Sequence, residues 1–275
     1  MLEKFSLKNK NAIITGAAGL LGIQHINSVL LNGGNVILID NNKLKLNIRL
    51  KELLKKFDKK RIQSFCGDIT KEKFIKTVCK KIVKKKVSID ILINNAAVDY
   101  KIDSHHKKLI KKTQLENFDL NIWKKDLDVG LMGALICTKI FGSEMAKQKS
   151  GVILNIASDL SFISPDNRIY EDKRNLKIKI VKPVSYSVVK HGIVGLTRYT
   201  ATYWANKNVR CNAIAPGGIQ NNQPKSFLKK VSKLIPMNRL SNQNEYMSSI
   251  LYLITDASSY TNGAILNVDG GRTIL

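Results

Sequence analysis

The 275-residue chain lacks most of the features that cross-link a protein, anchor it in a membrane or direct its export. Its four cysteines (Cys66, Cys79, Cys137 and Cys211) form no CxxC pair and no metal-ligand spacing, which argues against a disulfide framework or a metal site. No segment approaches about 18 uninterrupted apolar residues, and charges stand where a signal peptide needs an apolar run. We therefore expect a cytoplasmic protein with reduced thiols and no membrane span.

Acidic residues are also scarce, since 21 Asp and Glu stand against 46 Lys and Arg, a formal net charge of +25. Such an excess is typical of proteins that bind nucleic acid or anionic membranes, because Lys and Arg neutralise phosphates. The alternative is a lysine-rich composition with its charges on solvated helix faces. The pattern favours this alternative, because scattered pairs such as Lys55-Lys56 and Lys80-Lys81 lack the interleaved aromatics of a stacking platform. The sequence thus predicts neither a nucleic-acid nor a membrane partner.

The chain contains no internal repeat, no low-complexity linker and no break in composition, which predicts one domain over residues 1–275. Short Val/Ile/Leu-rich runs alternate with segments of helical periodicity. Strands buried on both faces read as such runs, and their alternation with helices is typical of a parallel sheet covered on both sides. We therefore predict an α/β, Rossmann-like, doubly wound fold with three layers and seven parallel strands. The predicted strands are Asn11–Thr15, Asn35–Asp40, Ile62–Phe65, Ile89–Ile93, Val152–Ile156, Val209–Ile214 and Ala264–Val268.

The first predicted strand runs into a glycine-rich turn of the form GxxGxxG, at Gly16, Gly19 and Gly22. Glycines permit a tight turn, and the helix that follows directs free N–H groups and a positive dipole end at a pyrophosphate. The second strand ends in Asp40, whose carboxylate can accept the ribose hydroxyls of an adenosine and would repel a 2′-phosphate. Together these features predict NAD as the cofactor, in preference to NADP, although the positive charge of Lys43 could weaken this preference.

Three later motifs follow the glycine turn in order: Asn94-Asn95-Ala96-Ala97, Tyr186-Ser-Val-Val-Lys190 and Pro216-Gly217. With the turn, they resemble the short-chain dehydrogenase/reductase family over nearly the whole chain, from Lys8 to Gly271. The resemblance implies that Asp68 and Ile69 contact the adenine, that Asn95 and Ala96 lie under its ribose, and that Ile219 meets the nicotinamide carboxamide. The expected cofactor residues are Gly16, Gly19, Leu21, Gly22, Asp40, Asp68, Ile69, Asn95, Ala96, Tyr186, Lys190, Pro216 and Ile219.

The same resemblance gives the chain a reaction, the interconversion of an alcohol and a ketone by hydride transfer. Tyr186 and Lys190 are four residues apart on a predicted helix and therefore share one face. A neighbouring ammonium favours the phenolate, so Lys190 would lower the pKa of Tyr186, which would act as general acid and base. Lys190 would also bind the nicotinamide ribose. Ser158, after the fifth strand, would polarise the substrate carbonyl.

The sequence departs from the family pattern at three places. Gly130 stands where the family usually has an Asn that supports a water relay to the lysine. Tyr186 follows Ser158 by 28 residues, well beyond the dozen or so common in the family. Asn221 replaces a Thr after the Pro-Gly motif and is a candidate substrate residue. The loss of the Asn keeps an alternative open, a catalytically weak dinucleotide-binding protein that serves as a sensor or assembly partner.

Two stretches, 99–121 and 159–183, are longer than ordinary loops and are expected on the substrate side. Arg168 in the second stretch, with Lys173, Arg174 and Lys182, could bind a phosphate or carboxylate, although solvated loop charge is the alternative. Residues 158–170 and 221–239 are similar to a subgroup of the family linked with bacterial surface-sugar and flagellin modification, which implies a phosphorylated or activated sugar as substrate. His105 and His106 in the first stretch are interpreted as surface residues rather than metal ligands.

The resemblance also implies an assembly of like subunits. The predicted helix from Trp123 and the helix that carries Tyr186 are the usual subunit contacts of the family. Both are apolar on more than one face, with Leu131 and Leu135 on the first and Ile193 and Leu196 on the second. We therefore expect a homodimer or homotetramer.

Overall fold

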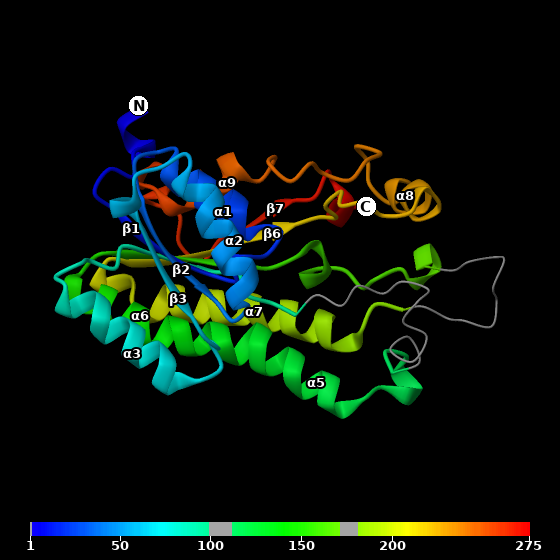
Figure 1. Cartoon of the computed structure of the whole chain (residues 1–275). Helices are drawn as coiled ribbons and strands as arrows, with labels where there is room; N and C mark the ends of the chain where they lie inside the picture. Colours follow the sequence, from blue (N-terminus) through cyan, green and yellow to red (C-terminus); the bar gives the residue numbers. More distant parts are fainter. Residues whose placement is uncertain (1, 99–111, 171–180) are drawn as a thin grey trace.

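The computed structural model describes residues 2–98, 112–170 and 181–275, and its centre is a single sheet of seven parallel strands (Figure 1). The strand order is β3-β2-β1-β4-β5-β6-β7, so the chain winds outward from β1 in one direction and then from β4 in the other. This order confirms the predicted doubly wound fold. The strands are β1 (Asn11–Thr15), β2 (Asn35–Asp40), β3 (Ile62–Cys66), β4 (Ile91–Asn94), β5 (Gly151–Ile156), β6 (Val209–Pro216) and β7 (Ile265–Val268).

Helices cover both faces of this sheet (Figure 1). Successive side chains of a strand point to opposite faces, so each strand contributes to two separate cores. Ile14 and Leu38 belong to the core with α1 and α9, whereas Ile13 and Ile37 belong to the core with α3 and α6. The helices are α1 (Gly22–Leu30), α2 (Lys43–Leu54), α3 (Glu72–Lys84), α5 (Leu120–Leu127), α6 (Gly133–Gln148), α7 (Val184–Tyr203), α8 (Lys225–Ser232) and α9 (Met247–Ile254).

The predicted helix Trp123–Lys147 is interrupted. A π-helical turn over Asp128–Met132 separates α5 from α6. Within the described residues, the continuous segment Leu120–Gln148 is the one helix long and apolar enough to cross a membrane by length and composition. It forms part of the sheet's covering layer, however, because Cys137, Phe141 and Met145 are fully buried in the core on that face. Its apolar character is therefore that of a core helix.

Some element boundaries differ from those predicted, for local reasons. Strand β4 begins at Ile91 rather than Ile89, because the backbone N–H and C=O of Ile89 bond the side-chain amide of Gln148 instead of a neighbouring strand. Helix α9 begins at Met247 rather than Glu245, whose carboxylate pairs with Arg239. Helix α8 was not predicted, because five of its eight residues have charged or hydroxyl side chains.

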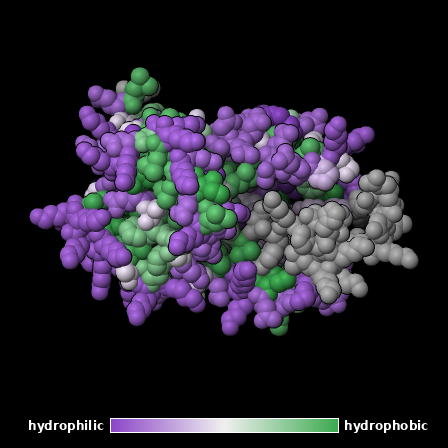
Figure 2. Space-filling model, viewed as in Figure 1, coloured by the Kyte–Doolittle hydropathy of each residue, from purple (hydrophilic) through white to green (hydrophobic). Residues whose placement is uncertain are grey.

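The surface is largely hydrophilic on the face seen in Figure 2, with smaller hydrophobic areas between protruding polar side chains. Among the described residues, Lys190 is the one lysine or arginine in the buried class, with 7% of its surface exposed. Three of the four cysteines are buried as free thiols, and burial raises the pKa of Cys137 to about 12. Cys66 is exposed.

Candidate active site

One cavity of about 890 Å³ brings the sequence motifs together. It lies at the carboxyl ends of the strands, next to β1 and β4, where the winding direction reverses. Ligands of open parallel sheets bind at this kind of position. Gly22 and Arg168 are the two predicted site residues that do not line the cavity. The predicted residues that do line it are Gly16, Gly19, Leu21, Asp40, Asp68, Ile69, Asn95, Ala96, Ser158, Tyr186, Lys190, Pro216, Ile219 and Asn221.

At the nucleotide end, the glycine turn is pinned against the end of β4. Gly16 has a φ of +63°, and a Cβ there would lie 2.8 Å from the Ala96 α-carbon, so only glycine fits. The Asn95 side-chain amide donates to the carbonyl oxygens of Thr15 and Gly16, each at 3.0 Å. Gly22 begins α1, where a Cβ would lie 2.5 Å from the carbonyl oxygen of Ala17. Gly22 therefore allows the turn and the helix to pack closely and does not line the cavity.

A buried histidine supports this turn and was missed by the sequence analysis. His25 on α1 is 1% exposed, and its Nε2 lies 3.0 Å from Asn95 Oδ1. The Asn95 amide nitrogen already donates to two carbonyl groups, so its oxygen must accept from a protonated Nε2. Burial lowers the pKa of His25 from 6.5 to about 4, which keeps the ring neutral. His25 thus fixes the orientation of the side chain that holds the turn.

Asp40 at the end of β2 has its carboxylate fixed by two backbone groups. The N–H of Ala18 donates to one oxygen at 2.9 Å, and the N–H of Asn42 donates to the other at 2.8 Å. The carboxylate therefore connects the glycine turn with the β2–α2 turn while lining the cavity. The basic residue that lines this end is Lys45 rather than Lys43.

The predicted catalytic residues meet at the other end of the cavity. Tyr186 and Lys190 come from the first and second turns of α7, and Ser158 lies two residues after the end of β5. The Lys190 ammonium donates to the carbonyl oxygen of Ile156 at 2.7 Å and lies 5.7 Å from the centroid of the Tyr186 ring. A buried ammonium held beside a phenol favours the ionised phenol.

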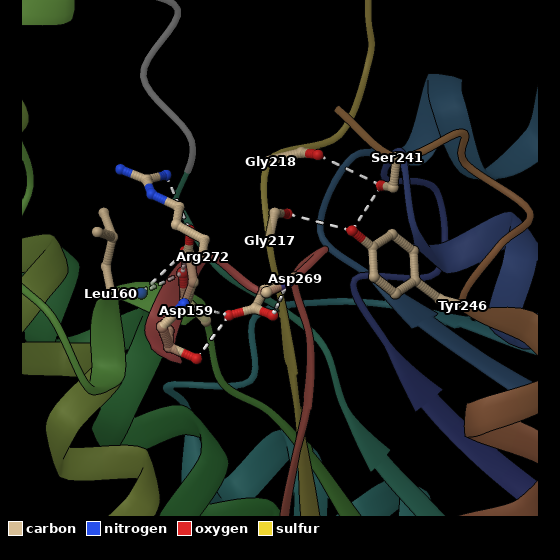
Figure 3. A network of polar contacts seen from close by, with 11 residues as sticks. Asp159, Leu160, Gly217, Gly218, Ser241, Tyr246, Asp269 and Arg272 are labelled. Carbon is tan, nitrogen blue, oxygen red and sulfur yellow. Dashed lines mark hydrogen bonds and ion pairs between the residues drawn. The ribbon is translucent and has the colours of Figure 1, made fainter. Parts of the chain in front are cut away.

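Ser158 is joined to a buried ion pair that the sequence analysis missed. Its hydroxyl donates to Asp159 Oδ1 at 2.8 Å. Arg272 donates to Asp159 Oδ2 at 2.9 Å, and both residues are labelled in Figure 3. The side chains of Arg272 and Asp159 are only 9% and 5% exposed. The one signal in the sequence was that Asp159 adjoins Ser158, because Arg272 lies 113 residues further along the chain.

A second network holds the Pro216–Ile219 segment. The Tyr246 hydroxyl donates to the carbonyl oxygen of Gly217 at 3.2 Å, and the Ser241 backbone N–H donates to that of Gly218 at 3.0 Å (Figure 3). Burial raises the pKa of Tyr246 to about 12, so this tyrosine stays protonated and keeps donating. The loop beside the predicted nicotinamide position is therefore fixed by Ser241 and Tyr246, in the segment just before α9.

Gly130 has a packing reason in the structure. It is buried in the π-helical turn, and a Cβ at this position would lie 2.6 Å from Val189 Cγ1. The valine, which directly precedes Lys190, fills the space that an Asn side chain would need. A relay through a side chain at residue 130 is therefore absent from this part of the described chain.

The substrate prediction for Arg168 needs a correction. Its side chain is 82% exposed and pairs with Asp166 at 2.8 Å, because the two residues share a tight turn. Among the described residues of this stretch, Lys182 is the cation that lines the cavity, and its ammonium lies 3.9 Å from the centroid of the Tyr186 ring. Lys173, Arg174, His105 and His106 lie outside the described residues.

Comparisons with known proteins show the family to which the chain belongs. A family model described as enoyl-(acyl carrier protein) reductase matches residues 16–273. The chain is 30% identical to an NAD-dependent glycerol dehydrogenase of Listeria innocua, covering 99% of this chain and 97% of the relative. It is 31% identical to a 2-dehydro-3-deoxy-D-gluconate 5-dehydrogenase of Bacillus subtilis, covering 98% and 96%.

A third relative is the post-translational flagellin modification protein A of Campylobacter coli, 28% identical over 96% of this chain and 98% of the relative. Among solved structures, a gluconate 5-dehydrogenase from Burkholderia cenocepacia in complex with NADP and tartrate superimposes with a TM-score of 0.83 at 22% identity, covering 100% of this chain and 99% of the other. The chain belongs to the short-chain dehydrogenase/reductase family, and it is an oxidoreductase of that family. The predicted family is thereby confirmed.

The described residues fit a dinucleotide. The turn residues Gly16 and Gly19 expose bare backbone to the cavity at the start of α1, where a pyrophosphate is stabilised by N–H groups and the helix dipole. Asp40 presents a carboxylate to the cavity at the end of β2, the strand beside β1, which is the position typical of a group that binds the adenosine ribose. The cavity continues without a break to Tyr186, so one bound molecule can reach both ends.

Proposed function

We propose that this chain is an NAD(H)-dependent oxidoreductase that interconverts a secondary alcohol and a ketone on a polyol or sugar-like substrate. The observation that carries the proposal is the single cavity that joins the glycine turn and Asp40 to Ser158, Tyr186 and Lys190. Bound NAD would supply the hydride acceptor, and NADH the hydride donor. We further propose that the protein works in the cytoplasm as a homodimer or homotetramer.

Each residue of the catalytic end then has a defined role. Tyr186 takes the proton of the substrate hydroxyl during oxidation and returns it during reduction. Lys190 holds its charge beside the phenol and binds the nicotinamide ribose. Ser158 binds the reacting oxygen of the substrate. Ile219 and the loop from Pro216 position the nicotinamide carboxamide.

The cofactor assignment rests on the Asp40 carboxylate, which would repel a 2′-phosphate. Relatives and neighbours include NAD-dependent and NADP-bound proteins, so the choice has to be tested on this chain. We expect the wild type to bind NADH more tightly than NADPH, measured by transfer of tryptophan emission to the nicotinamide. Asp40→Asn keeps the shape and one acceptor oxygen but loses the charge, so its NADH affinity should fall roughly 10-fold and the preference should disappear.

The catalytic assignment is tested by Tyr186→Phe, which keeps the ring and removes the proton donor. Its turnover of polyols with NAD should fall by roughly 10²- to 10⁴-fold, the range for a lost general acid–base, while NADH binding stays unchanged. A Tyr186→Phe protein as active as the wild type would exclude the proposed chemistry. Absence of binding for both cofactors would exclude the whole function.

The second candidate is a dinucleotide-binding sensor or assembly protein with weak catalysis, which the observation at Gly130 favours. Val189 occupies the place of the family's relay side chain.

The named relatives act on glycerol and on a deoxygluconate, and one modifies flagellin, which supports a polyol or sugar-like substrate, including the phosphorylated or activated sugar expected from the sequence. Tight NADH binding without turnover of any of these would favour the sensor.

A further inference from the structure

The Ser158 hydroxyl caps the short helical turn Asp159–Ser161 and makes two hydrogen bonds there. It donates to Asp159 Oδ1 at 2.8 Å and accepts from the Leu160 backbone N–H at 3.2 Å. The same N–H also donates to Asp159 Oδ1 at 2.8 Å, so the hydroxyl and carboxylate oxygens are held side by side. A serine hydroxyl otherwise rotates to suit its partners, and these contacts therefore select one orientation of Ser158.

The backbone of Ser158 is tied to the helix that carries the predicted catalytic tyrosine and lysine. Ser161 Oγ accepts from the Ser158 N–H at 3.2 Å and donates to the carbonyl oxygen of Lys190 on α7 at 2.9 Å. Ser158, Ser161 and Lys190 are all buried. These bonds fix the backbone of Ser158 relative to α7, and the contact with Asp159 then sets the direction of its side chain.

Asp159 is in turn held by a residue from the end of the chain. Arg272 donates to Asp159 Oδ2 at 2.9 Å, whereas Ser158 bonds the other carboxylate oxygen. The side chains of Asp159 and Arg272 are 5% and 9% exposed, so little water competes for the carboxylate. A hydrogen bond to a charged group is stronger than one between neutral groups, which makes the carboxylate a firm support for the hydroxyl.

The turn after β7 that carries Arg272 is fixed by its own contacts. Asp269 Oδ2 accepts from the backbone N–H of Thr273 at 2.8 Å and from its hydroxyl at 2.6 Å. Gly271 has a φ of +88°, a left-handed conformation that favours glycine. A Cβ on Gly217 would lie 2.8 Å from the Asp269 α-carbon, so the turn packs against the Pro216–Ile219 segment (Figure 3). Arg272 therefore reaches Asp159 from a well-supported position.

We propose that Asp159 is a positioning residue for Ser158, and that Arg272 positions Asp159 from the turn after β7. The carboxylate keeps the Ser158 hydroxyl where it binds the reacting oxygen of the substrate, and it acts on the reaction through Ser158. A misplaced group at a reacting centre can lower the rate by about 10²-fold, so the support of one hydroxyl has a measurable effect on turnover. This inference rests on the proposed oxidoreductase function.

The test is a double-mutant cycle between Ser158 and the ion pair. Asp159→Asn with Arg272→Met, here called the neutral pair, removes both charges, so neither is left buried without its partner. The neutral pair is made in the wild type and in Ser158→Ala. Glu52→Gln on α2 is the matched control, because Glu52 pairs with Arg49 at 2.7 Å and does not line the cavity.

For each protein, kcat and KM are measured for the oxidation of glycerol and of D-gluconate with NAD. NADH affinity is measured by nicotinamide fluorescence, and folding by urea unfolding. Asp159→Glu keeps both charges and moves the carboxylate by one methylene group. The same cycle with Asp159→Glu decides the question if the neutral pair does not fold.

We expect Ser158→Ala to lower kcat by roughly 10²- to 10³-fold, the range for the loss of one donor to a reacting oxygen. The neutral pair should lower kcat roughly 10-fold in the wild type, because a neutral acceptor replaces a charged one. In Ser158→Ala the neutral pair should change kcat by no more than about twofold, because no hydroxyl remains to be positioned. KM and NADH affinity should be unchanged in every variant, and Glu52→Gln should match the wild type.

The proposal is overturned if the neutral pair lowers kcat by the same factor with and without the Ser158 hydroxyl, because Asp159 would then act independently of Ser158. It is also overturned if the neutral pair leaves kcat of the wild type unchanged. A wild type that binds NADH but oxidises no polyol, sugar or sugar acid would instead remove the proposed function, and with it the reaction in which Asp159 would act.

Discussion

The stability of the site beside Ser158 depends strongly on Arg272, because this residue pairs with the buried Asp159 carboxylate. Arg272→Met would leave the Asp159 carboxylate buried without its cation, which costs about 3–5 kcal/mol when one partner of a buried pair is removed. We expect the midpoint of urea unfolding to fall accordingly.

The double variant Asp159→Asn with Arg272→Met removes both charges and should recover much of the lost stability. Its turnover should nevertheless be lower than that of the wild type, because Ser158 has lost the carboxylate that orients its proton. If the double variant is as unstable as Arg272→Met, the ion pair is not the source of the loss.

His25 makes stability depend on pH. Its folded pKa of about 4 lies below the ordinary 6.5, so folding favours the neutral ring. The contribution is complete above about pH 6.5 and is lost as the pH falls toward 4, amounting to about 3 kcal/mol for a shift of this size. The free energy of unfolding of His25→Gln should therefore vary less between pH 7 and pH 4 than that of the wild type. Parallel curves for the two proteins would contradict the assignment.

At the level of elements, the π-helical turn sets how closely α5 and α6 approach α7. Gly130→Asn would place a side chain against Val189 and should lower the free energy of unfolding by about 1–3 kcal/mol, the usual cost of overpacking. Combining it with Val189→Ala should restore part of the loss. Gly195→Asn on α7 is the control, because nothing lies within 4 Å of a Cβ there. Chemical denaturation measures all four proteins, and equal losses at residues 130 and 195 would refute the packing argument.

The strands were predictable because burial on both faces leaves a direct trace in the sequence, as in Asn35–Asp40, which the structure reproduces residue for residue. The nucleotide end was predictable for a related reason, since motifs at strand ends meet at one edge of a parallel sheet. The π-helical turn and α8 leave no comparable pattern. Asp159 and Arg272 are paired only by the complete fold, and Lys182 was one of several cations in a stretch whose course the sequence does not determine.

For the whole molecule, exposed apolar side chains on the α6 and α7 layer suggest where copies meet. Leu135 is 43% exposed and Val188 40%, and the stacked rings of Tyr199 and Tyr203 extend the same helix layer. We expect a homodimer or homotetramer by light scattering after gel filtration. Leu135→Lys with Val188→Lys should shift it toward monomer, whereas Leu44→Lys on α2, where Leu44 is 71% exposed, should not. An unchanged mass in the double variant would exclude this face.

The contact between Asp159 and Arg272 also bears on the order in which the molecule can be completed during synthesis. Strands β1 to β4 and the glycine turn emerge early and can form the nucleotide half on their own side of the sheet. Asp159 emerges next, but Arg272 follows β7, which is the last strand of the sheet in chain order. In a nascent chain, burial of the Asp159 carboxylate is therefore unfavourable until β7 and Arg272 have joined the fold. The catalytic end of the cavity is then the last part to be completed.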